Sequence, residues 1–203
     1  MMEQDMQEIL FTPEALAQRV KELADQITQD YAGKSPLIVG TLRGSFVFMA
    51  DLVRQINLPL TVDFLSASSY GSGTESSGQV KLKLDLADDI SGRDVLIIED
   101  IVDSGNTLSK LLPELQKRGP ASLKVCALLD KPERRVLPFQ ANYVGFTIPD
   151  AFVVGYGLDF DQHYRQLPYI GVRKPSVYEE PPSPRGRDPG AGDPRPLKGV
   201  SSI

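Results

Sequence analysis

Two apolar runs separated by one helical pattern constrain the fold of this chain more than any other feature. "DVLIIED" (94–100) and "SLKVCALLD" (122–130) have the near-continuous apolar character of strands buried on both faces. Between them lie the turn "DSGNT" and the helical pattern "LSKLLPELQKRG", which ends at Gly119. A strand, a helix and a second strand in this order form a βαβ unit, so the two strands are expected to run parallel in one sheet.

The same alternation recurs along the chain. Thr12 and Pro13 can start an amphipathic helix that reaches Gly33, and we expect this helix to be the first element. The strand pattern "PLIVG" (36–40) precedes the helical pattern "FVFMADLVRQI" (46–56), and the later apolar runs "YVGFTIP" and "FVVGYGL" indicate further strands. The sequence therefore predicts an α/β fold with a Rossmann-like, mostly parallel central sheet flanked by helices.

A hairpin with a long tip is predicted in the first half of the chain. "LTVDFLSAS" (60–68) and the alternating "QVKLKLDL" (79–86) favour strands. The segment between them, "SYGSGTESSG" (69–78), has too few apolar residues to pack and is expected to be a mobile loop.

The chain length and a change of composition predict one domain and a tail. With 203 residues and 41% hydrophobic residues, the chain can bury one substantial core, which we place in residues 1–174. Residues 175–203 are rich in Pro and Gly and poor in apolar residues. Such a segment cannot offset its ordering entropy by burial, so a disordered C-terminal tail is predicted.

The overall charge excludes several classes of function. A net charge of -5 and a pI near 5.0 argue against a general binder of nucleic acid or of membrane surfaces. No apolar run reaches the roughly 20 residues that span a bilayer, and the first residues are acidic rather than signal-like. The single cysteine, Cys126, reads as an inert core thiol in a reducing compartment, so a cytoplasmic location is expected.

The turn after the 94–100 strand has the chemistry of an anion site. Gly105 allows close backbone approach, Ser104 and Thr107 offer hydroxyls, and the following helix begins with free N–H groups, which together suit a phosphate monoester. Glu99 and Asp100 just upstream cannot favourably face a phosphate. They could accept hydrogen bonds from vicinal hydroxyls or help to hold a divalent cation, so a sugar phosphate meets both demands.

On the charge pattern alone, a solvated acidic strand end followed by an ordinary turn explains this stretch equally well. Other phosphate loops do not match, because the sequence has neither G-x-x-x-x-G-K-[ST] nor G-x-G-x-x-G after a strand.

The family resemblance distinguishes these readings. "VLIIEDIVDSGNTL" resembles the phosphoribosyl-diphosphate (PRPP) signature of type I phosphoribosyltransferases. "VGTLRGSFVFMADL", "SSYGSGTESSG", "LLDKP" and "IPDAFVVGYGLDFDQHYRQLPYIGV" occur in the order seen in hypoxanthine-guanine phosphoribosyltransferases, and the match covers roughly residues 9–173. The resemblance implies the type I fold with a small hood and a mobile active-site loop.

The resemblance also implies a reaction and its residues. The enzyme would transfer the phosphoribosyl group of PRPP to N9 of hypoxanthine or guanine in purine salvage, giving IMP or GMP and pyrophosphate. Asp103 would be the general base at purine N7. The implied PRPP- and nucleotide-binding residues are Leu42, Arg43, Gly44, Ser69, Tyr70, Glu99, Asp100, Ser104, Gly105, Asn106, Thr107 and Arg165.

The base and metal sites follow from the same resemblance. The implied base-binding residues are Lys131, Phe152, Val153 and Asp159, and the implied Mg²⁺ ligands are Glu99, Asp100 and Asp159. Leu42 and Arg43 match a pair that is commonly joined by a cis peptide, so a non-proline cis bond is predicted there. Out of context, each of these residues also suits an ordinary turn, core or surface position.

Several alternatives stay open at this point. Ala151 stands where several relatives have a charged or polar residue beside the base, which leaves the preference among hypoxanthine, guanine and xanthine open. A transferase for another base, such as xanthine or uracil, and a regulator that senses PRPP are the competing functions. The sequence has no basic stripe or N-terminal helix-turn-helix region for the second of these. The resemblance implies a homodimer or homotetramer without identifying the interface.

Overall fold

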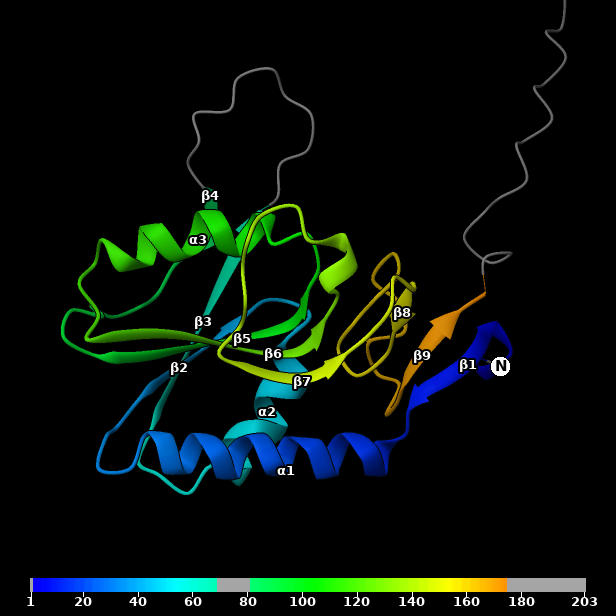
Figure 1. The fold of residues 1–203 in the computed structure, drawn as a ribbon, viewed down its shortest axis with the longest axis horizontal. Coiled ribbons are helices and arrows are strands. Elements are labelled where there is room, and N and C mark those ends of the chain that lie inside the picture. The colour runs from blue at the N-terminus through cyan, green and yellow to red at the C-terminus, as the bar shows by residue number, and fades with distance from the viewer. Residues whose placement is uncertain (1, 69–80, 175–203) are drawn as a thin grey trace, which may run out of the picture. The chain divides into compact units, whose positions relative to one another are not determined.

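The computed structural model of the chain describes residues 2–68 and 81–174. A six-stranded sheet in the order β4-β3-β2-β5-β6-β7 forms its centre, as Figure 1 shows. All neighbouring strands pair in parallel except β3 and β4, which confirms the predicted mostly parallel sheet and the predicted hairpin. The strands are β2 (Leu37–Thr41), β3 (Thr61–Ser68), β4 (Lys81–Leu84), β5 (Asp94–Val102), β6 (Ser122–Asp130) and β7 (Tyr143–Thr147).

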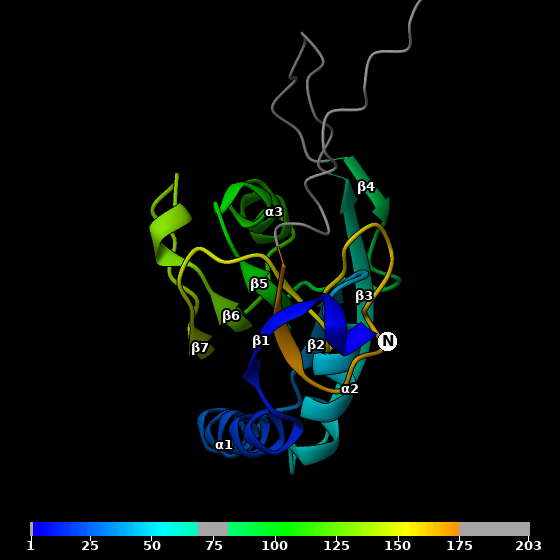
Figure 2. The same cartoon turned by 90° about the vertical axis from the view of Figure 1, so that its right-hand side faces the viewer.

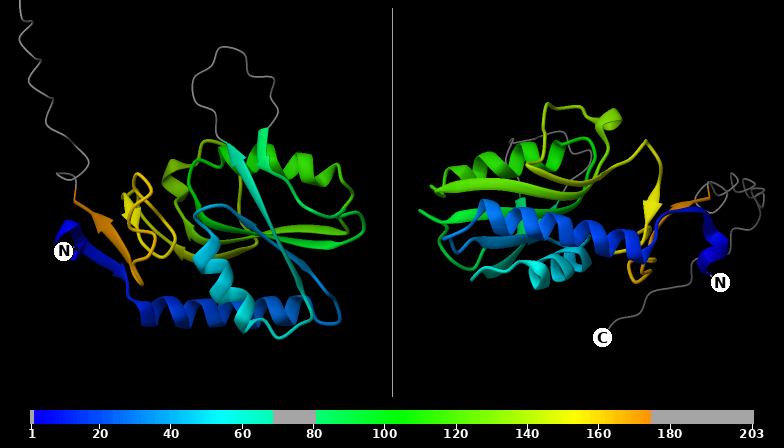
Figure 3. Two further views of the ribbon diagram at one scale, coloured as in Figure 1. Left: turned by 180° about the vertical axis from the view of Figure 1, so that it is seen from behind. Right: turned by 60° about the horizontal axis from the view of Figure 1, so that its bottom comes forward.

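Helices cover both faces of this sheet. Helices α1 (Pro13–Asp30) and α2 (Phe46–Gln55) lie on one face and α3 (Asn106–Gln116) lies on the other (Figures 1 and 3). The hydroxyl of Thr12 accepts from Ala15 N at 3.3 Å and caps α1, as the sequence predicts. Each face has its own apolar core, and Ile97 and Ile98 of β5 belong to opposite cores because successive side chains of a strand alternate.

A second, three-stranded antiparallel sheet forms the hood. Its order is β1-β9-β8, with β1 at Met6–Phe11, β8 at Val153–Val154 and β9 at Ile170–Arg173. The prediction that the helix 12–33 comes first is wrong, since a 3-10 turn (Met2–Asp5) and β1 precede α1. The apolar run "FVVGYGL" also yields only a two-residue strand, because the chain turns at Gly155 and Gly157 (φ +100° and +103°).

Contacts between distant segments attach the hood at the carboxyl ends of the parallel strands (Figure 2). The rings of Phe11 and Phe146 stack with their centroids 3.9 Å apart. The hydroxyl of Tyr156 donates to Asp51 Oδ2 in α2 at 2.6 Å. Ligands of open α/β sheets bind beyond this edge, so the hood lies over the expected site.

Residues Met1–Arg173 make up one compact unit. The predicted mobile tip (69–78) and the predicted disordered tail (175–203) lie outside the described residues. No helix in the described ranges combines the length and the apolar character that a membrane crossing requires.

Candidate active site

The acidic pair, Glu99 and Asp100, lies near the end of β5. This strand runs to Val102, two residues further than the predicted strand. Glu99 is 8% exposed, and its Oε1 is buried without a hydrogen-bond partner among the described residues. Its other oxygen, Oε2, lies 2.6 Å from Thr41 Oγ1 at the end of β2. Burial and the neighbouring Asp100 raise the pKa of Glu99 to about 8.

The Thr41 hydroxyl lies within hydrogen-bonding distance of two acceptors. Thr41 Oγ1 also lies 2.9 Å from the carbonyl oxygen of Ile98, and a hydroxyl has only one hydrogen to donate. The Thr41 hydroxyl donates to Glu99 Oε2, and this hydrogen bond opposes the rise in the pKa of Glu99 that burial causes. Burial thus favours the neutral form of the Glu99 carboxyl, whereas a bound cation would favour its ionised form.

Asp100 is packed against the loop that follows β2. A Cβ at Gly44 would lie only 1.5 Å from Asp100 Oδ2, so a glycine is needed there for the loop to approach the carboxylate. Burial raises the pKa of Asp100 to about 6, while the charge of Arg165 lowers it and that of Asp159 raises it. The two charges belong to the hood, which places hood residues within electrostatic reach of the acidic pair.

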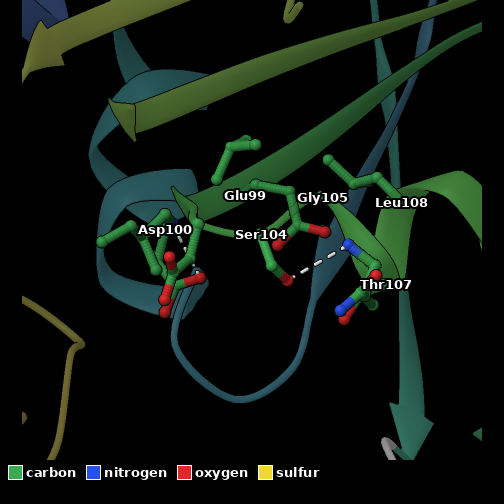
Figure 4. A pocket seen from close by; sticks show the side chains of 10 residues that line it. Glu99, Asp100, Ser104, Gly105, Thr107 and Leu108 are labelled. Atoms are coloured by element: carbon green, nitrogen blue, oxygen red, sulfur yellow. Dashed lines mark hydrogen bonds between the residues drawn. The ribbon is translucent and has the colours of Figure 1, made fainter. Parts of the chain in front are cut away.

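A cavity of about 260 Å³ lies beside this pair and is lined by residues 99–108. Figure 4 shows Glu99, Asp100, Ser104 and Thr107 around it. Gly105 has φ +82°, a left-handed conformation that favours glycine, and it precedes α3 without offering a capping side chain. The Ser104 hydroxyl accepts from Asn106 N at 3.3 Å. The start of α3 lines this cavity, so its N–H groups that lack an acceptor within the helix are close to any anion bound there, as an anion cradle requires.

The segment after β6 contacts residues 104–107, which form the candidate anion cradle. The N–H groups of Val136 and Leu137 donate to Ser104 O at 3.1 and 3.4 Å. The guanidinium of Arg135, 13% exposed, pairs with Asp130 at the end of β6, and its Cδ lies against the position that a Cβ of Gly105 would take. The cradle is thus held by contacts that lie outside its own sequence.

Three charged groups gather around Asp103. Its Oδ1 is buried without a hydrogen bond among the described residues, and Arg134 Nε lies 3.5 Å away. Arg134 Nη1 also lies 3.6 Å from Asp150 Oδ1, and Lys131 Nζ lies 3.9 Å from the same oxygen. Burial lowers the pKa of Lys131, and the carboxylates of Asp103 and Asp150 oppose that shift. The Asp103 carboxylate thus lies within electrostatic reach of the buried Lys131 amine. This arrangement is suited to recognising a group that has both a hydrogen-bond donor and an acceptor.

The loop after β2 has the predicted cis peptide bond between Leu42 and Arg43. Arg43 Nη1 donates to Gln162 Oε1 in the hood at 2.7 Å. Arg165 pairs with Asp159 at 2.7 Å, and the backbone N–H of Gln162 donates to Asp159. Gln162 therefore connects Arg43, Arg165 and Asp159 of the predicted site.

The remaining predicted residues are less closely tied to this group. Phe152 is 40% exposed and packs edge-to-face on Phe160, with the ring centroids 5.7 Å apart. Val153 is buried in β8 and pairs with Val172 of β9. Ser69 and Tyr70 lie outside the described residues.

The donor set fits a hard cation that the ligand also coordinates. Across residues 2–68 and 81–174, no group of three or more His, Cys, Asp or Glu could hold a metal ion by itself. Glu99 and Asp100 nevertheless offer adjacent carboxylate oxygens, the ligands that Mg²⁺ prefers, and Glu99 Oε1 lacks a described partner. Mg²⁺ would therefore need oxygen atoms from a bound phosphate to complete its coordination.

Sequence reasoning missed Thr41 and Arg134. Thr41 begins "TLRGS" and looks like a strand end, and Arg134 lies in the polar run "KPERR". Only the fold brings them to Glu99 and Asp103, although the density of charge after Lys131 was a signal for the second.

An open α/β sheet with a hood, and with an acidic pair beside a helix start at one strand end, is an arrangement suited to binding a phosphorylated sugar. The phosphoribosyl transferase domain family matches residues 6–161. The chain therefore belongs to the phosphoribosyltransferase family.

Particular relatives narrow this class. The chain is 50% identical over 179 residues to the hypoxanthine-guanine phosphoribosyltransferase of Bacillus subtilis, which covers 88% of this chain and 99% of the relative. It resembles a crystal structure of a hypoxanthine phosphoribosyltransferase from Staphylococcus aureus with a TM-score of 0.84 and 50% identity, over 88% of this chain and 97% of that one. It is also 49% identical to the bifunctional protein TilS/HprT of Listeria innocua, over 88% of this chain, but spans only 28% of that relative's length.

Proposed function

We propose that this chain is a hypoxanthine-guanine phosphoribosyltransferase of purine salvage. The observation that carries the proposal is the junction of β5 and α3, where the acidic pair, Asp103 and the cradle lie along one cavity. The similarity to hypoxanthine-guanine enzymes over nearly their whole length supports the choice of base.

The cradle and the acids divide the phosphoribosyl group between them. Backbone N–H groups and hydroxyls of residues 104–107 bind the 5'-phosphate, because the start of α3 carries positive partial charge. Glu99 and Asp100 bind the ribose hydroxyls, because carboxylate oxygens accept hydrogen bonds from hydroxyl groups. The acids lie upstream in the strand, so they face the sugar rather than the phosphate.

Asp103 and Lys131 recognise the N7 and O6 edge of the base. Asp103 takes the proton from N7 as the N9 lone pair forms the bond to C1', while the bond from C1' to the pyrophosphate oxygen breaks. Lys131 donates to O6, and Phe152 stacks on the ring while Val153 offers backbone groups to its edge. Arg134, 3.5 Å from Asp103, holds that carboxylate in place.

The pyrophosphate end lies between the loop after β2 and the hood. Backbone groups of Leu42 and Gly44 and the guanidinium groups of Arg43 and Arg165 bind it. The contacts predicted for Ser69 and Tyr70 fall outside the described residues. Glu99, Asp100 and Asp159 would hold Mg²⁺, and Asp159 would also face the base. When bound, Mg²⁺ supplies positive charge against the oxygens of the departing pyrophosphate.

The wider predictions also enter as proposals. We further propose that residues 1–174 form the catalytic domain and that the protein is cytoplasmic; residues 175–203 lie outside the described residues. The family resemblance supports a homodimer or homotetramer. Light scattering of the purified chain measures the molar mass and so tests this oligomeric state.

Nucleotide formation tests the proposal. The protein is incubated with PRPP and Mg²⁺ and, separately, with hypoxanthine, guanine, xanthine, adenine and uracil. Formation of IMP and GMP at rates well above those of the other three products is expected. Silence with all five bases despite measurable PRPP binding would replace the enzyme with a PRPP sensor.

A further inference from the structure

Gln162 lies at the tip of a tight hairpin in the hood. Phe160 and His163 exchange two backbone hydrogen bonds, 3.2 and 2.9 Å long, so Asp161 and Gln162 are the two central residues of the turn. Both are left-handed, with φ +48° and +67°. Turns of this kind favour Asn and Gly at these positions, because a Cβ is disfavoured there. Gln162 therefore occupies a position where glycine would be the less strained residue.

The side chain of Gln162 joins two elements that are far apart in the sequence. Its Oε1 accepts from Arg43 Nη1 at 2.7 Å and lies 3.4 Å from Arg165 Nη2. Its backbone N–H donates to Asp159 Oδ2 at 2.8 Å. By contrast, the side chain of Asp161 makes no hydrogen bond or ion pair with the described part of the chain, although it shares the turn.

The amide oxygen solves an electrostatic problem. Two guanidinium groups repel one another when they converge, and an acceptor between them offsets that repulsion. Asp159 already pairs with Arg165, and a second carboxylate at this point would neutralise the remaining positive charge. A neutral amide aligns the two cations and leaves their charge available to an anionic ligand.

We infer that Gln162 is a positioning residue that holds Arg43 and Arg165 together as a paired site for the pyrophosphate group of PRPP. The inference rests on the proposed function for the identity of the ligand. The contacts of the Gln162 side chain offset the cost of its left-handed backbone, which glycine would adopt more easily.

Glycine substitutions at the two turn positions separate the role of the side chain from that of the backbone. Gln162→Gly and Asp161→Gly both relieve a left-handed residue, so both proteins should fold and melt at or above the wild-type temperature. Only Gln162→Gly removes the acceptor. Calorimetric titration with inorganic pyrophosphate in Mg²⁺ buffer is expected to show about ten-fold weaker binding for Gln162→Gly, the size of one hydrogen bond to a charged group, and wild-type binding for Asp161→Gly.

Two further variants test the charge argument. Gln162→Ala should weaken pyrophosphate binding as much as Gln162→Gly, and Gln162→Glu should weaken it further because a carboxylate competes for both guanidinium groups. In steady-state assays the KM for PRPP should rise in all three Gln162 variants, with the KM for hypoxanthine within two-fold of the wild type.

The outcomes distinguish this inference from the proposed function. Wild-type pyrophosphate affinity in Gln162→Gly, or equal weakening in Asp161→Gly, overturns the positioning role even if the enzyme makes IMP. Selective weakening in the Gln162 variants supports the role even if no base is converted, in which case the transferase proposal alone fails. A wild-type protein that does not bind pyrophosphate overturns the inference.

Discussion

Substitution of Gly44 by alanine should inactivate the enzyme without unfolding it. The new methyl group would lie 1.5 Å from Asp100 Oδ2 and 2.4 Å from Asp100 Cγ, whereas ordinary contacts begin near 3.4 Å. The carboxylate must therefore move by about 2 Å, and its Oδ1 would leave the N–H of Ile101, now 2.9 Å away. A misplacement of about 1 Å can cost about 100-fold in rate, so kcat/KM for IMP formation should fall by at least roughly that factor.

The stability cost should be modest, because the atoms in the way belong to a side chain that can rotate. We expect about 1–3 kcal/mol, the usual cost of overpacking, and a fall in melting temperature of about 2–12 °C for a domain of this size. The control is the double mutant with Asp100→Ala, in which the obstructing carboxylate is absent. Gly44→Ala should then cost less than about 1 kcal/mol.

The reasoning would be refuted by an equal stability cost of Gly44→Ala in the wild-type and Asp100→Ala backgrounds. Full activity of the Gly44→Ala enzyme would also refute it, because the loop would then not constrain the carboxylate.

Three other residues provide independent predictions. Because burial raises the pKa of Glu99 from 4.5 to about 8, the folded state favours the protonated carboxyl, and stability is lost as the pH rises through the folded-state value. The ligand-free protein in chelator should lose on the order of 3 kcal/mol between pH 5 and pH 8, and Glu99→Gln should flatten that dependence; parallel pH profiles of melting temperature would contradict this. Asp103→Asn should lower kcat by about 10²–10⁴ while the KM for PRPP stays within two-fold, and unchanged kcat would remove Asp103 from the mechanism. Burial raises the pKa of Cys126, so its thiol should resist iodoacetamide until the protein is unfolded, and rapid labelling of the native protein would show that the core opens.

The central βαβ unit could be predicted because its information is local. The runs 94–100 and 122–130 are apolar on both faces, which suits strands covered by helices on both sides, and both strands form as expected. The turn of the proposed cradle could be placed for the same reason, since Gly105 and its neighbours directly follow the strand. The cis bond at Leu42 was predictable from the family resemblance and not from local propensity.

The hood was harder to predict because its partners are distant in sequence. The sequence of β1, "MQEILF", has too many polar residues to indicate a strand by itself. It forms a strand by pairing with β9 at the other end of the described chain. Tertiary pairing decides such short strands, since β-propensity depends on the neighbours that a strand meets.

The contacts around the charged side chains were likewise invisible in the sequence. Thr41 at the end of β2 contacts Glu99 in the neighbouring strand β5. Arg134 contacts Asp103, and Gln162 of the hood contacts Arg43. Each contact depends on which loops meet at the strand ends, so these contacts could not be predicted from the sequence.

The most direct test of the account is a crystal structure of the protein with IMP, pyrophosphate and Mg²⁺. The account predicts the 5'-phosphate in the cradle of residues 104–107, the ribose hydroxyls against Glu99 and Asp100, and N7 of the base within hydrogen-bonding distance of Asp103. A nucleotide bound with its phosphate away from the start of α3, or with its base on the far side of the acidic pair from Asp103, would contradict the division of labour on which the mechanism depends.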